Sequence, residues 1–119
     1  MPGSPAVFPL GHTNNTIKQA VKDWCEGGEA MEAVKWRFGR IEEWDVSSIS
    51  NMALLFSYAH MFVGDVAKWD LSRVTDMSGI FLYARKFNGD VSKWDVSSVV
   101  TMTNMFKSAP SFNCDISKW

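Results

Sequence analysis

Carboxylate and ammonium side chains recur at fixed intervals along this chain, and they are the residues whose spacing could support chemistry. Two columns of aspartates and one of lysines each repeat every 25 residues. Stacked carboxylates ligate calcium in some repeat proteins, so these columns raise the question of a metal site. The members are Asp45, Asp70 and Asp95 in the first aspartate column, Asp65, Asp90 and Asp115 in the second, and Lys68, Lys93 and Lys118 in the lysine column.

The first aspartate column favours a structural role over calcium binding. Each member is followed by Val or Leu and then by Ser, so its carboxylate can accept a backbone N–H bond in an Asx turn. Calcium-binding repeats also need glycine-rich loops with several oxygen donors per turn, and the sequence lacks them. We therefore expect no metal and no other cofactor.

The lysine column predicts a short basic stripe. Neighbouring rungs of a stacked sheet lie about 4.8 Å apart, so three stacked lysines would repel one another. The stripe is best explained as a solvated face that discourages edge-to-edge association. Contact with a glycan or a phosphate group is the alternative.

An aromatic column offers a further candidate for binding. Tyr58 and Tyr83 are 25 residues apart, with Leu82 and Arg85 beside the second tyrosine. Variable columns let a repeat protein alter its binding surface, and aromatic and arginine side chains are enriched at interface centres. The sequence leaves open whether the tyrosines bind a protein partner or only cover the turns. The candidate interaction surface comprises Tyr58, Tyr83, Leu82, Arg85, Lys68, Lys93 and Lys118.

Catalysis is not predicted. The same residues recur at every step, whereas an active site gathers unlike residues at one place, and His12 and His60 have no nucleophile constellation around them. A net charge of −1 and a pI near 6.1 favour neither nucleic acid nor an anionic membrane. No apolar run reaches the roughly 20 residues of a membrane helix, and we recognise no signal peptide.

The columns are positioned by tandem repeats. Residues 41–65, 66–90 and 91–115 align without insertions, and residues 116–119 begin a fourth repeat. A constant period indicates that each repeat is one structural unit stacked on a copy of itself. The large apolar residues of each column should then form buried ladders. With the aspartates that fix the corners, the ladder residues are Trp44, Trp69, Trp94, Trp119, Met52, Met77, Met102, Phe56, Phe81, Phe106, Asp45, Asp70 and Asp95.

Within a repeat, short alternating patterns predict one rung of a sheet. Residues 91–95 and 99–102 are expected to be extended, and residues 105–109 to form one helical turn packed on the sheet. Glycines 39, 64 and 89 share a column and are expected to turn the corner into the next rung with positive φ.

The segment before the repeats divides into a linker and a helical cap. Residues 1–15 contain several prolines and glycines and are predicted to be a linker or a trimmed N-terminal segment. Residues 16–40 are predicted to be a helical N-terminal cap. The first helix has its N-cap among residues 14–16 and is stopped by Gly27-Gly28, and the second runs from Glu29 to Trp36. A stack of repeats must cover its apolar end to stay soluble. A partner-binding helix is the alternative.

These repeats resemble the BspA-like bacterial surface-protein repeats, which occur also in a mycoplasma lipoprotein domain family. The resemblance covers residues 41–119, although the first repeat ends in Met61-Phe62-Val63-Gly64 where the family has Phe-Asn-x-Asp. It implies a right-handed solenoid related to leucine-rich repeats, displayed on cell surfaces and used in adhesion or protein binding, with no catalytic residues. The matching residues are Trp94-Asp-Val-Ser97, Val99, Met102, Met105-Phe106, Ala109, Phe112-Asn113 and Asp115-Ile116.

Together these observations predict an α/β repeat protein, a leucine-rich-repeat-like right-handed β-solenoid with short helical turns and an N-terminal helical cap. The expected function is that of a non-enzymatic binding or scaffold module for protein–protein interaction or surface adhesion. A structural subunit of a larger assembly and a glycan-binding module are the alternatives. We expect further repeats or another subunit to cover residues 102–119, and we expect Cys25 and Cys114 to remain unpaired.

Overall fold

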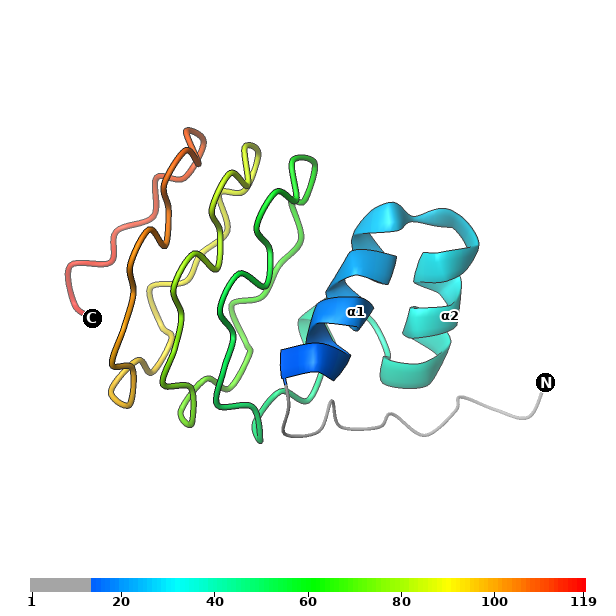
Figure 1. Ribbon diagram of the computed structural model, residues 1–119, viewed down its shortest axis with the longest axis horizontal. Helices are drawn as coiled ribbons and strands as arrows, with labels where there is room; N and C mark the ends of the chain where they lie inside the picture. Colours follow the sequence, from blue (N-terminus) through cyan, green and yellow to red (C-terminus); the bar gives the residue numbers. More distant parts are fainter. Residues whose placement is uncertain (1–13) are drawn as a thin grey trace.

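The computed structural model describes residues 14–119, which form two α-helices followed by three stacked coils of chain (Figure 1). Helix α1 spans Asn14–Glu26, helix α2 spans Gly28–Phe38, and a single-turn 3-10 helix, η1, spans Ile41–Glu43. Coil 1 is residues 41–65, coil 2 is 66–90, and coil 3 is 91–115, with 116–119 continuing from it. The helices lie at one end of the stack with α1 next to coil 1, and the C-terminus lies at the other end.

The predicted β-solenoid is wrong. Residues 14–119 contain no β-strand and therefore no sheet, and only two isolated parallel bridges, Asn51–Asp76 and Asp76–Thr101, link neighbouring coils. Residues 91–95 and 99–102, expected to be extended rungs, are mostly turns and irregular chain. Residues 105–109, expected to form a helical turn, are not helical. The leucine-rich-repeat architecture that the resemblance implied needs such a sheet, so that expectation is wrong as well.

The backbone of each coil instead runs as consecutive tight turns. We call residues 52–59, 77–84 and 102–109 the turn segments of coils 1, 2 and 3. Every second N–H group in a turn segment donates within its own coil, as that of Leu55 does to the carbonyl of Met52. In coils 1 and 2, the N–H groups that alternate with these donate to the next coil. The bonds from coil 1 to coil 2 are Met52 N–H to Asp76 O, Leu54 to Ser78, Phe56 to Ile80, and Tyr58 to Leu82, at 2.8–2.9 Å.

Left-handed residues explain why these segments are not strands. Leu54 and Tyr58 have φ of 63° and 62°, and Gly79 and Tyr83 repeat this at 60° and 58° in coil 2. A left-handed residue every fourth position closes each turn and interrupts extended geometry. The conformation costs a non-glycine residue roughly 1–2 kcal/mol. The bonds between coils offset that cost because they pair amides that would otherwise be unsatisfied.

Two ladders of phenylalanine rings form the centre of the core. In the first, Phe81 stacks on Phe56 at 5.4 Å and on Phe106 at 5.6 Å between ring centroids. The second, formed by Phe62, Phe87 and Phe112, has spacings of 5.9 and 6.1 Å. The two ladders also stack on each other within every coil, at 3.8–4.4 Å. Each coil therefore completes the core of its neighbours.

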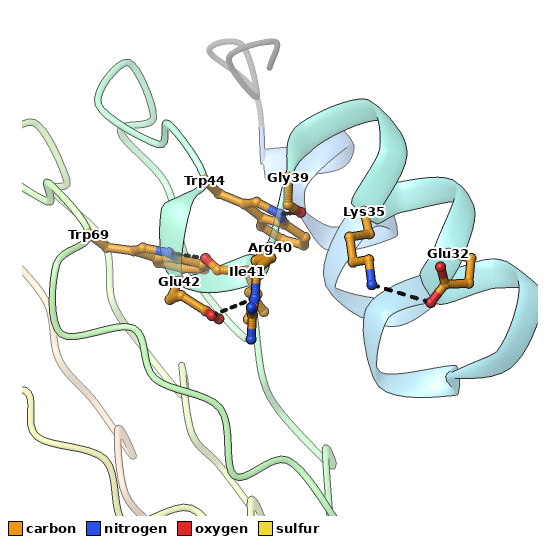
Figure 2. Close-up of polar contacts among 8 residues, drawn as sticks. All are labelled: Glu32, Lys35, Gly39, Arg40, Ile41, Glu42, Trp44 and Trp69. Atoms are coloured by element: carbon orange, nitrogen blue, oxygen red, sulfur yellow. Dashed lines mark hydrogen bonds and ion pairs between the residues drawn. The ribbon is translucent and has the colours of Figure 1, made fainter. Parts of the chain in front are cut away.

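The tryptophans tie successive coils together through their indole N–H groups. Trp69 donates its Nε1–H to the carbonyl of Ile41 at 2.7 Å, as Trp44 does to Gly39 at 2.8 Å (Figure 2). Trp94 and Trp119 repeat the bond to residues 66 and 91, at 2.9 and 3.1 Å. The carbonyls of residues 41, 66 and 91 each accept a second bond, from the backbone N–H of the tryptophan three residues later. A buried indole thus keeps its polar group paired.

Two of the three glycines in the glycine column have a different cause from the predicted one. Gly39 has the predicted positive φ, at 85°, whereas Gly64 and Gly89 do not. At Gly89 an added Cβ would lie 2.8 Å from the ring of Phe87, and at Gly64 it would lie 2.6 Å from the ring of Phe62. These two glycines therefore make room for an aromatic ring two residues earlier. Coil 3 has Cys114 in this column, and the ring of Phe112 there is only half-buried.

Helix α1 lies next to coil 1, and helix α2 packs against α1 (Figure 1). Ile17, Ala20 and Val21 of α1 are buried in the same core as the coils, and Trp24 packs edge-on against Trp44 at 5.9 Å. Both helices predicted from residues 16–36 are present, and each extends two residues beyond the predicted outer limit. The linker prediction falls almost entirely on residues 1–13, outside the described residues. The two cysteines are free thiols.

Candidate functional site

A groove of about 430 Å³ lies between α1 and coil 1. Its wall on α1 is polar and basic at Lys18 and Lys22, with Val21 between them, and its wall on coil 1 is the turn segment. A second hollow of about 430 Å³ shares Cys25, Tyr58 and Ala59 with the first and extends to residues 60–64. We call these two hollows together the helix–coil groove.

The coil side of the groove exposes large apolar side chains. Leu54 is 43% exposed, Tyr58 61%, Met61 70% and Val63 71%. All four line the groove. Apolar side chains that cluster at a hollow mark interaction sites, whereas isolated ones need no explanation. This cluster is therefore the strongest candidate for a binding surface among the described residues.

The tyrosine column contributes directly to this surface. Tyr58 stacks on Tyr83 of coil 2 at 4.9 Å with an interplanar angle of 18°, and its ring lies 6.2 Å from that of His60. Leu82 and Tyr83 are half-buried, and Arg85 is exposed beyond them. The structure thus joins the two predicted tyrosines into one stack at the groove.

Sequence reasoning missed most of the groove. It did not include Leu54, Met61 or Val63 in the candidate interaction surface. It predicted that the helical segment covers the end of the stack, with partner binding as the alternative, and did not place that segment beside the tyrosines. One signal was available, because the first repeat departs from the common pattern at residues 61–64. Those residues line the second hollow.

The turn segment of coil 1, on the coil side of the groove, also has a row of backbone carbonyls that accept no backbone hydrogen bond. In coils 2 and 3, the carbonyls of alternate turn-segment residues accept bonds from the preceding coil. The equivalent carbonyls of coil 1, on Ala53, Leu55 and Ser57, accept no backbone hydrogen bond, and the repeat geometry directs them toward α1. No acidic side chain lines the first hollow. The groove therefore combines hydrogen-bond acceptors, apolar surface and the positive charges of α1.

Cys25 lines both hollows without being an activated nucleophile. Part of the residue reaches solvent, but burial around the thiol raises its pKa to about 11. The thiolate is the reactive form of cysteine. At neutral pH the group is therefore a protonated thiol that contributes a small, weakly polar surface.

The lysine column lies outside the helix–coil groove. Lys68, Lys93 and Lys118 are exposed, and none forms an ion pair with another described residue. The structure does not place them in the hollow that contains the tyrosine stack. The predicted interaction surface thus separates into the tyrosine part at the groove and a solvated lysine column.

The aspartate columns form Asx turns. Asp70 Oδ1 accepts the backbone N–H of Ser72 at 3.0 Å and its hydroxyl at 2.6 Å. The same pair of bonds is made by Asp45, Asp95 and Asp90. Within residues 14–119, no group of three or more His, Cys, Asp or Glu side chains could hold a metal ion.

These bonds make stability depend on pH. The serine hydroxyl and then its backbone N–H hold the pKa of Asp45, Asp70 and Asp95 below the ordinary value. A carboxyl whose pKa is lowered by folding stabilises the protein fully above its unfolded pKa of about 3.9. The contribution is lost as pH falls through the folded pKa.

We therefore expect the free energy of unfolding to decrease as pH falls below about 5. Replacing the three aspartates together by Asn should flatten this decrease, because an amide oxygen accepts the same bonds without titrating. Urea unfolding between neutral and acidic pH measures the slope. As a control, replacing Ser47, Ser72 and Ser97 by Ala should remove only part of it, and identical slopes in all three proteins would refute the assignment.

The described chain is a stack of 25-residue coils with a groove at its helical end. Residues 28–119 match the family described as Mycoplasma protein of unknown function, DUF285, and the chain belongs to this family. Neither the curated proteins nor the solved structures give a significant match. Among residues 14–119, no helix has the length and apolar character needed to cross a membrane.

Proposed function

We propose that this protein is a non-enzymatic binding module that takes up an extended segment of a partner protein in the helix–coil groove. The observation that carries this proposal is the exposed apolar cluster of Leu54, Tyr58, Met61 and Val63 beside the carbonyl row of coil 1. Extended segments bind by donating backbone N–H groups to such a row, while their side chains enter adjacent hollows.

The charges of the groove define the chemistry of the partner segment. Lys18 and Lys22 are exposed on the α1 wall, with no acidic side chain in the first hollow. Complementary charge speeds association and fixes the orientation of a bound segment. The preferred segment therefore carries acidic side chains on its α1 side and apolar ones toward Leu54 and Tyr58.

Membership of the family, together with the resemblance to BspA-like repeats, supports a setting on the cell surface, where such binding would serve adhesion. A structural subunit of a larger assembly is the second candidate, favoured by the half-exposed rings of coil 3. Glycan binding is the third, and it would use the exposed lysine column. Both alternatives place the partner away from the groove.

The test is a selection of random linear peptides displayed against the wild-type protein, followed by titration of the enriched peptides. We expect enriched sequences to combine acidic and apolar residues. Lys22→Glu should weaken their binding at least about tenfold, and Tyr58→Ser should do the same. Both side chains are exposed, so the thermal melting of each variant should match that of the wild type.

Lys93→Glu provides the matched control because it makes the same charge reversal on the solvated lysine column. It should leave the dissociation constant within about twofold of the wild type. Peptides that bind Lys22→Glu and Tyr58→Ser as tightly as the wild type would place the site elsewhere. Peptides that lose affinity only in Lys93→Glu would favour the lysine column.

A further inference from the structure

The outer face of coil 3 presents a row of backbone N–H groups with no hydrogen-bond partner. In coils 1 and 2, the alternate N–H groups of each turn segment donate to the next coil. The equivalent donors of coil 3 are those of Met102, Asn104, Phe106 and Ser108, and none of them has an acceptor in the described chain. The carbonyls that complete the pattern, on residues 101, 103, 105 and 107, already accept bonds from coil 2.

This face is therefore chemically one-sided. It offers four donors and one acceptor of the same kind, the carbonyl of Val100. At this position of the inner coils the bond runs in the opposite direction, from the later coil to the earlier one. The N–H of Val100, for example, donates to the carbonyl of Thr75 at 2.7 Å. A matching surface must carry carbonyl oxygens at alternate residues of a turn segment. The carbonyls of residues 76, 78, 80 and 82 have this arrangement toward coil 1.

The side chains of the face are equally specific. Phe81 and Phe87 are fully buried in coil 2, whereas the equivalent Phe106 and Phe112 are half-buried, and Met102 is 37% exposed where Met77 is fully buried. Rings stacked 5.4–6.1 Å apart cover these positions inside the stack. Another pair of rings with the same spacing would complete both ladders.

The geometry points to one occupant for this face, a further coil of the same 25-residue type. Such a coil brings the carbonyl row and both phenylalanine rings in one register. A second copy of this chain does not fit in the same way. Two coil 3 faces would set donors against donors, and α1 stands across the groove from the carbonyl row of coil 1, where it would block the approach of a whole coil.

The test appends a copy of residues 95–119 after Trp119 and compares it with an appended scramble of the same residues. Amide hydrogen exchange followed by NMR reports each donor separately. We expect the amides of Met102, Asn104, Phe106 and Ser108 to exchange at close to the unprotected rate in the 119-residue chain and with the scramble. With the copy, their exchange should slow at least about tenfold.

The same turn segment contains its own control. The N–H groups of Met105, Lys107 and Ala109 already bond to carbonyls three residues back, so they should be protected in all three proteins. The inference fails if the copy folds and the four donors stay unprotected. It also fails if sedimentation shows the 119-residue chain to be a dimer in which those donors are already protected.

Discussion

Replacing Phe81 by Ala is expected to lower the free energy of unfolding by about 3–5 kcal/mol, because the middle ring of the first phenylalanine ladder is removed. The ring is 0% exposed, and it stacks on Phe56, Phe106 and Phe87, the last at 3.9 Å. Domains of this size are stable by only about 5–15 kcal/mol. Urea unfolding followed by tryptophan fluorescence measures the loss.

Phe106→Ala is the matched control, since it removes the same side chain from the same column at the end of the stack. Its ring is half-buried, and on its outer side it meets Trp119 at 6.4 Å between ring centroids but no further phenylalanine among the described residues. The loss should be clearly smaller because less contact area disappears and the cavity opens to solvent. Equal losses at the two positions would contradict the view that neighbouring coils complete the core.

Trp69→Ala is expected to cost a similar amount, about 3–5 kcal/mol. The side chain is 4% exposed, its ring stacks on Trp44 at 6.1 Å, and its Nε1–H reaches the carbonyl of Ile41 at 2.7 Å. The mutation therefore opens a large cavity and removes the indole hydrogen bond between coils 1 and 2. Thermal and urea unfolding should both show the change.

Trp69→Phe separates the two effects. It keeps an aromatic ring but loses the indole donor and part of the volume, so an intermediate loss of about 1–3 kcal/mol is expected. Trp36→Ala is the control for removing a tryptophan, because Trp36 is 55% exposed on α2. It should change stability by about 0.5 kcal/mol or less. A Trp69→Phe protein as stable as the wild type would show that the indole bond contributes nothing.

The 25-residue period was sufficient to group the side chains that meet between coils. Because one period is one coil, residues such as Phe56 and Phe81 occupy equivalent places in successive layers. The helices were also predictable, since the burial of Ile17, Ala20 and Val21 follows from their helical spacing. Both inferences depend only on spacing, and spacing is visible in the sequence.

Backbone conformation was not predictable in the same way. Leu54 and Tyr58 are residue types that avoid left-handed φ, so nothing local indicates that they close tight turns. Alternating apolar residues suggested strands, but the bonds between coils decided the conformation. The groove depended on a further unknown, the placement of α1 against coil 1, which no local pattern of Lys18 or Lys22 specifies.

The hydrogen bonds between turn segments give the stack an electrical direction. All four of these bonds from coil 1 to coil 2 point the same way, as do the four from coil 2 to coil 3. Aligned peptide dipoles sum to partial charges at the two ends, as they do in a helix. Coil 3 is then the electropositive pole, whereas coil 1 is the electronegative pole next to Lys18 and Lys22. Adding coils would lengthen this dipole without enlarging the charge at either pole.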